Sequence, residues 1–226
     1  WLLYRNPQLK IMVVSANAVK AAEFSTFCLQ LIRDVPFLRH LQPRHDQRQS
    51  TIAFDVGPAT PDQSPSVKSV GITGQLTGGR ADVIVADDIE IPHNSDTQGK
   101  RDRLLELIKE FDAVLKPGGR IIYLGTPQTE QSIYNELPNR GYVIRVWPAR
   151  YPRDLSRYGS RLAPIIATAI ERNPKLAGNP TDEMRFTDED LTERELSYGR
   201  SGFALQFMLD TSLSDADKHP LKLSDL

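Results

Sequence analysis

Short apolar runs alternate, over the first two thirds of the chain, with segments in which apolar residues recur every three or four positions. The runs predict buried strands, and the spacing of three or four predicts amphipathic helices. Strands are expected at 10–15, 50–56, 67–73, 83–86, 120–124 and 142–147, and helices at 16–34, 94–115 and 130–137. Strands that alternate with helices are typical of α/β proteins with a mostly parallel sheet.

The pattern changes after residue 150. Helical spacing over 160–172 and 187–209, with a Pro- and Gly-rich connection between the two segments, predicts a small helical subdomain. The last residues are polar and include a proline, which is typical of a linker. The expected organisation is therefore an α/β core at 1–150, a helical subdomain at 151–212 and a linker at 213–226.

The central apolar run, Val83 to Ala86, is followed directly by the carboxylates Asp87 and Asp88. In open α/β sheets, ligands bind at the carboxyl ends of the strands. Two adjacent acids repel each other unless a cation or a donor lies between them. This arrangement favours a site for Mg²⁺ and a nucleotide. The alternative is that one of the two acids only caps a turn or the next helix.

Composition restricts the remaining choices. The chain has 226 residues, of which 39% are hydrophobic and 25% charged, with a net charge of −1, so no overall basic field indicates nucleic acid. Cys28 is the only cysteine, which excludes a disulfide framework and favours a reducing compartment. No run approaches the ~20 apolar residues of a membrane span. The chain begins at Trp1 without an initiator Met, and we expect it to be a fragment.

Two enzyme classes fit the α/β part. The segment 115–122 resembles the turn and strand that follow the Asp-bearing strand of S-adenosylmethionine-dependent methyltransferases. That fold needs a glycine-rich loop after its first strand, and residues 15–19 contain no glycine. A P-loop ATPase instead needs an acid after a buried strand and a small polar residue after the next core strand. Asp87 and Thr126 occupy these places, so the ATPase is the preferred hypothesis.

Four stretches together resemble the ATPase domain of the large terminase subunit of tailed bacteriophages. The similarity is greatest to the podovirus group, where the protein is also called DNA maturase B. The four stretches are 11–17, 77–92, 121–128 and 201–209. The resemblance covers nearly the whole chain. It implies a RecA-like (ASCE) P-loop NTPase core with a helical lid.

The resemblance assigns roles to the acids by position. Asp87 resembles the Walker B aspartate, which holds Mg²⁺ through water. Asp88 stands where most terminases have a catalytic Glu that orients the attacking water, and Asp is shorter by one methylene. Glu90 is the alternative for this role, and we rank Asp88 above it.

Three further residues receive roles in the same way. Thr126, with Gln128 close behind it, resembles the coupling motif that contacts the nucleotide and links loss of the γ-phosphate to subdomain motion. Related motors receive an arginine finger from a neighbouring subunit. Thr77 occupies the position where many terminases carry this arginine, and Arg80 is the nearby candidate.

The chain also departs from the family pattern, because no segment matches G-x-x-x-x-G-K-S/T, the loop that cradles phosphates. In the family this loop precedes a strand like 10–15, and a nuclease domain follows the ATPase domain. The resemblance implies ATP and Mg²⁺ as cofactors. It also implies double-stranded DNA, a portal protein and a small terminase subunit as partners, a homo-oligomeric ring on the portal, no membrane, and the host cytoplasm as location.

Two basic stretches are candidates for contact with DNA phosphates. The first contains Arg39, Arg44 and Arg48. The second consists of Arg145, Arg150, Arg153, Arg157 and Arg161. Such side chains neutralise phosphates without reading sequence, which suits a motor, although a solvated surface is the simpler interpretation of either stretch. A non-catalytic module that binds portal or DNA therefore remains the alternative from another functional class.

Overall fold

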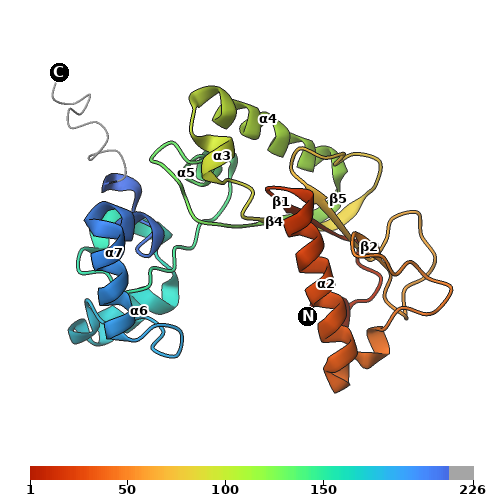
Figure 1. Cartoon of the computed structure of the whole chain (residues 1–226), viewed down its shortest axis with the longest axis horizontal. Helices are drawn as coiled ribbons and strands as arrows, with labels where there is room; N and C mark the ends of the chain where they lie inside the picture. Colours follow the sequence, from red (N-terminus) through yellow and green to blue (C-terminus); the bar gives the residue numbers. More distant parts are fainter. Residues whose placement is uncertain (214–226) are drawn as a thin grey trace. The chain divides into compact units, whose positions relative to one another are not determined.

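The computed structural model of the chain describes residues 1–213, so most of the predicted linker at 213–226 lies outside the described residues. The chain forms two compact units, Trp1–Gly125 and a second that begins at Thr126, each considered by itself (Figure 1). The division thus falls at Gly125 and not at the predicted residue 150. The reason is that residues 126–150 bond to the helical part, where the Ala149 N–H donates to the Phe207 carbonyl at 2.7 Å.

The first unit is built on a five-stranded sheet in the order β2-β3-β1-β4-β5. Its strands are β1 (Ile11–Ser15), β2 (Ala53–Phe54), β3 (Val67–Gly71), β4 (Ala81–Asp87) and β5 (Leu115–Leu124). All neighbouring strands are parallel except β2, which pairs antiparallel with β3 at one edge. The prediction of an α/β fold with a mostly parallel sheet is confirmed.

Helix α2 (Ala18–Asp34) covers the face of the sheet that carries Val13. Its buried residues Leu29 and Ile32 join Val13 in one hydrophobic cluster. The side chain of Asn17 caps the helix by accepting a hydrogen bond from the Lys20 N–H at 3.0 Å. The 3₁₀ helix η1 (Pro36–Leu41) packs against α2, and the short helix α1 (Leu2–Arg5) packs against η1.

Helix α4 (Gln98–Val114) covers the opposite face, as Figure 1 shows. Phe111 of this helix lies against Tyr123 of β5, with ring centroids 6.0 Å apart. The predicted helix start at 94–95 is wrong, because residues 92–95 form the separate short helix α3 (Pro92–Ser95). The hydroxyl of Thr97 caps α4 instead.

The second unit is helical. Its α-helices are α5 (Ile133–Glu136), α6 (Pro164–Arg172) and α7 (Asp188–Gln206). Short 3₁₀ helices lie between and after them: η2 (Leu137–Arg140), η3 (Leu155–Arg157), η4 (Gly159–Arg161), η5 (Pro174–Leu176) and η6 (Thr211–Leu213). The predicted strand at 142–147 is wrong, since only Val146 forms a bridge, with Leu162, and Val143 and Trp147 are exposed. None of the helices in residues 1–213 is long and apolar enough to cross a membrane.

Helix α7 consists of two helical segments joined by a kink. Gly199 interrupts it with φ 69° and ψ 173°, a backbone conformation that side chains rarely adopt. The helix begins with a capping box in which Thr187 and Asp190 bond each other's backbone N–H groups. Both segments of α7 contribute residues to the interior of the second unit.

Candidate functional site

The carboxyl edge of the sheet brings together the ends of β1 and β4. These strands are parallel neighbours, and their register pairs Ser15 with Asp87. Asp87 is also paired with Leu124 of β5 on the other side. Because parallel strands end at one edge, residues far apart in sequence meet there, as the sequence predicts for a ligand site of this class.

Asp88 leaves the strand in a left-handed conformation, with φ 45°. Its N–H donates to the Leu124 carbonyl at 2.9 Å, which ties the turn to β5. Aspartate adopts this conformation more readily than most residues, but the backbone strain still costs free energy. Backbone strain of this kind is often found at functional sites. Both Asp87 and Asp88 line one cavity of about 410 Å³. The two predicted acids are therefore brought together.

The other walls of this cavity come mainly from the start of α2. Asn17, Lys20 and Glu23 line it, together with Phe24. The Lys20 ammonium pairs with Glu23 at 2.8 Å and both side chains are exposed. The N-terminus of α2 has a partial positive charge that favours anions. Asn17 and Lys20 were not predicted as site residues, although an N-cap directly after a strand at this edge is the signal for them.

Burial and the neighbouring Asp88 both raise the pKa of the Asp87 carboxyl above its ordinary value. The Asp87 carboxylate also accepts no hydrogen bond from any described residue. A cation at this position would offset both effects. Among residues 1–213, no group of three or more His, Cys, Asp or Glu side chains is placed to hold a metal ion. A cation here would therefore need water or ligand oxygens besides the two carboxylates.

Glu90 lies outside the cavity wall. It is only 1% exposed, and the adjacent Ile89 is fully buried. Of the two candidates for orienting water, only Asp88 lines the cavity with Asp87. The structure thus gives a geometric reason to rank Asp88 above Glu90.

Thr126 and Gln128 belong to the second unit, directly after β5 and Gly125. The Gln128 side-chain amide donates to the Thr126 carbonyl at 3.0 Å, which closes a local turn. Thr126 is half-buried, and the following Pro127 is buried. Their predicted contact with a nucleotide stays a prediction.

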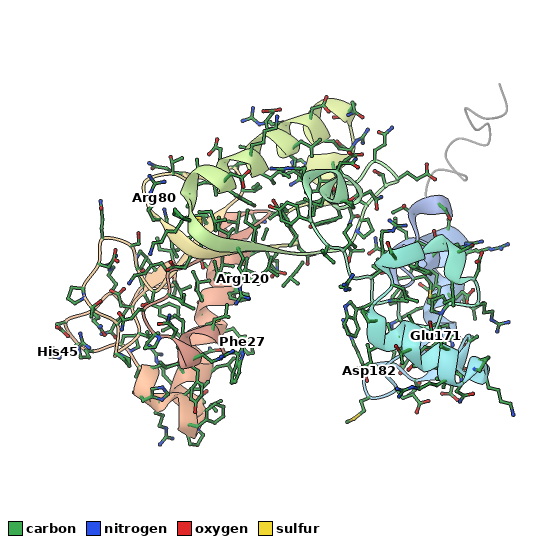
Figure 2. The ribbon with its side chains drawn as sticks, turned by 180° about the vertical axis from the view of Figure 1, so that it is seen from behind. Phe27, His45, Arg80, Arg120, Glu171 and Asp182 are labelled. Carbon is green, nitrogen blue, oxygen red and sulfur yellow. The ribbon has the colours of Figure 1, made fainter. Side chains whose placement is uncertain are left out.

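Arg80 lies at the opposite end of β4 from Asp87, and Figure 2 labels it near the C-terminal end of α4. Its guanidinium donates to the Ala113 carbonyl, and with Thr77 it lines a separate cavity of about 410 Å³. A strand of this length separates its two ends by roughly 20 Å at about 3.3 Å per residue. Arg80 therefore does not join Asp87 within one chain, and a role as an arginine finger requires a second copy.

The three predicted DNA-contact arginines differ in their surroundings. Arg48 pairs with Asp55 at 2.9 Å, and Arg44 donates to the Gly57 carbonyl. Both side chains thus hold the loop between η1 and β3. Arg39 is exposed, and its side chain bonds to no other described residue. Arg39 is the freest of the three to meet a phosphate.

Comparison with known proteins identifies a relative. No protein-family model matches the chain. The large terminase subunit of Enterobacteria phage T3 is 57% identical to it over 232 aligned positions, which cover 100% of this chain. The chain spans 40% of the length of that relative. With this identity along its whole length, and with an α/β core that ends β4 in paired acids, the chain belongs to the family of phage large terminase subunits.

Proposed function

We propose that the chain is part of a DNA-packaging motor and contributes the metal-binding and water-orienting acids of its ATPase site. The observation that carries the proposal is the cavity at the carboxyl edge of the sheet, where Asp87 and Asp88 face the start of α2. The 57% identity to a large terminase subunit supports the choice of a packaging ATPase over other nucleotide-binding enzymes.

The residues of this site suit Mg²⁺ and ATP. Mg²⁺ prefers oxygen ligands, keeps several waters and offsets the negative charge of phosphates. Asp87 would hold the ion through water, and the raised pKa of its carboxyl reflects a site in which a cation is favourable. Asp88 would accept a hydrogen bond from the attacking water and so orient it. The partial positive charge at the start of α2 would favour the phosphates.

Several parts of the proposal concern the whole protein. Double-stranded DNA would be moved through a portal by a homo-oligomeric ring, with a small terminase subunit as a partner, in the host cytoplasm. Thr126 would couple loss of the γ-phosphate to movement of the helical unit, and Arg80 would act on the site of a neighbouring copy. These proposals rest on the relative's identity as a terminase large subunit.

A thermal-shift experiment tests which class of ligand the protein binds. It uses the full-length polypeptide, meaning this chain within a protein as long as its phage T3 relative. We expect Mg·ATP to raise the melting temperature, S-adenosylmethionine to leave it unchanged, and Asp87→Asn to reduce the effect of Mg·ATP. A ligand stabilises the state that it binds, by about 2.7 kcal/mol at a hundredfold excess over its Kd. Stabilisation by S-adenosylmethionine alone would favour the methyltransferase, and no shift with either ligand would favour a non-catalytic module.

A further inference from the structure

The second unit contains a cavity of about 780 Å³ that the proposed ATPase site does not use. It is lined by residues of three segments: 150–158, 178–179, and 188–210 in and after α7. Its wall is rich in charge, with four arginines and four acids. These are Arg150, Arg153, Arg157 and Arg200, and Asp154, Asp188, Glu195 and Asp210.

Two of the four arginines are already neutralised. Arg150 pairs with Asp188 at the start of α7 and also donates to the Gly178 carbonyl at 2.9 Å. Arg157 pairs with Asp210 at 2.8 Å and with Asp154 at 3.4 Å. These ion pairs connect the cavity-lining segments to one another. They have a structural role, and because Arg157 is shared by two carboxylates, this set of five side chains carries a net charge of −1.

The other two arginines are not neutralised. Arg153 and Arg200 are exposed, and neither side chain has a hydrogen bond or ion pair with any residue in 1–213. The remaining acid, Glu195, is also exposed and forms no ion pair within the same range. Two unpaired guanidinium groups and one unpaired carboxylate therefore line the cavity. The eight charged side chains of the wall sum to zero, so these free guanidinium groups, and not a net positive charge, are what could attract an anion.

The guanidinium of Arg153 lies close to the backbone of Gly178. A Cβ added to this glycine would come 2.9 Å from Nη2 and 3.0 Å from Nε. Gly178 has φ 94°, so the position also suits glycine for its backbone conformation. Its N–H donates to the Tyr151 carbonyl at 2.8 Å, which fixes the glycine in place. Arg153 thus has room beside Gly178, where a side chain would meet it, and keeps its charge unpaired.

We propose that Arg153 and Arg200 bind a phosphate group in this cavity. A guanidinium presents several N–H donors in a planar fork that matches phosphate oxygens. A guanidinium that has no ion pair gives up none when it binds an anion. The expected source of the phosphate is the backbone of a DNA strand, and this choice of source rests on the proposed function.

The test compares arginines inside and outside the cavity. Binding of a short labelled DNA duplex and of labelled ATP is measured by fluorescence anisotropy for the full-length polypeptide. We expect Arg153→Ala and Arg200→Ala each to weaken duplex binding roughly tenfold, the effect of removing a hydrogen bond to a charged group. The slope of log affinity against log salt should become shallower by about 0.9 for each phosphate that the variant no longer neutralises. Arg172→Ala is the matched control, because Arg172 is exposed at the end of α6 and lies outside the cavity.

The ATP measurement distinguishes a DNA backbone from a nucleotide as the source of the phosphate. Weaker duplex binding with unchanged ATP binding identifies DNA, and weaker ATP binding identifies a nucleotide phosphate. Unchanged binding of both ligands, or an equal loss in Arg172→Ala, would overturn the proposal. Arg153→Gln keeps most of the side-chain stem and covers the case in which alanine prevents folding. Loss of ATP turnover in Asp87→Asn tests the proposed ATPase site separately, so failure of one idea leaves the other standing.

Discussion

At the scale of single residues, Asp87 and Asp88 are neighbours with different environments. Asp87 ends a buried strand, and burial together with Asp88 raises the pKa of its carboxyl. Asp88 lies in a turn with positive φ and is tied to β5 by its N–H. The sequence alone predicts that the two acids lie together. It does not predict that Asp88 adopts a left-handed conformation, because the turn depends on the Leu124 carbonyl of another strand.

Replacing Asp87 by Asn should stabilise the metal-free chain at neutral pH. A carboxyl whose pKa is raised in the folded state holds its proton more tightly there than in the unfolded state. Its charge therefore costs stability above the raised pKa, and the cost disappears as the pH falls to the ordinary value of 3.8. We expect Asp87→Asn to raise the melting temperature at pH 7, with a difference that shrinks on acidification.

Asp82 provides the matched control for this experiment. It lies in the same strand, but its carboxylate accepts the Lys10 N–H at 2.7 Å and pairs with Lys116 at 3.2 Å. Asp82→Asn should therefore lower the melting temperature at pH 7. A fall with Asp87→Asn as large as with Asp82→Asn would contradict the account of the Asp87 environment.

Replacing Asp88 by Asn should block ATP turnover in the full-length polypeptide and leave nucleotide binding largely intact. Asn keeps the preference for a left-handed backbone and loses the negative charge that orients water. Such groups contribute roughly 10²–10⁴-fold to rate. Steady-state hydrolysis and nucleotide affinity are measured side by side. Full activity of Asp88→Asn with loss of activity in Glu90→Gln would reverse the ranking of the two acids.

At the scale of elements, the hydrophobic pattern predicts β1, β3, β4 and the long helices, because each has a clear buried face. The strand predicted at 142–147 does not form, since Val146 bonds to Arg161 and Ala163 just before α6, and no residue of the segment pairs with a named strand within residues 1–213. The cap of α4 is Thr97 and not 94–95, because α3 takes the earlier residues. The alternation of apolar residues alone cannot distinguish such a segment from a true strand, because a strand also needs a partner strand to pair with.

Replacing Gly71 by Ala should lower the free energy of unfolding, because the added Cβ would crowd the backbone at the start of α2, where Asn17 lines the cavity. A Cβ at this position would lie 2.7 Å from the Ala18 nitrogen and 2.9 Å from the Asn17 carbonyl carbon. Overpacking of this kind costs about 1–3 kcal/mol. Urea unfolding measures the loss. Gly99→Ala is the control, since nothing lies within 4 Å of that Cβ in α4, and it should leave stability unchanged or slightly raised. Equal effects of the two substitutions would refute the packing argument.

At the scale of the whole molecule, the resemblance to terminases predicts the α/β core and the helical part, and the identity to the phage T3 protein confirms the family. The boundary at Gly125 was not predictable, because residues 126–150 join the helical unit through backbone bonds that leave no periodic signal. The cavity beside Arg153 could not be predicted from the sequence either. Which arginines remain free depends on ion pairs such as Arg150 with Asp188, formed across 38 positions of sequence.

The 226-residue chain by itself should hydrolyse ATP negligibly. It contains no G-x-x-x-x-G-K-S/T segment, and the backbone donors and lysine of such a loop normally hold the phosphates. Phosphate release by the purified chain with Mg²⁺ and ATP is the measurement. Robust turnover that Asp87→Ala abolishes would mean that residues 1–226 contain a complete site.

The most direct test of the central claim is Mg²⁺-dependent ATP hydrolysis by the full-length polypeptide and its Asp87→Asn variant. If the cavity beside Asp87 and Asp88 is the ATPase site, the variant should lose most of its turnover, because its Mg²⁺ site lacks the carboxylate that holds the ion. Normal Mg²⁺-dependent turnover in a folded Asp87→Asn variant would contradict this account and would leave the paired acids with a structural role only.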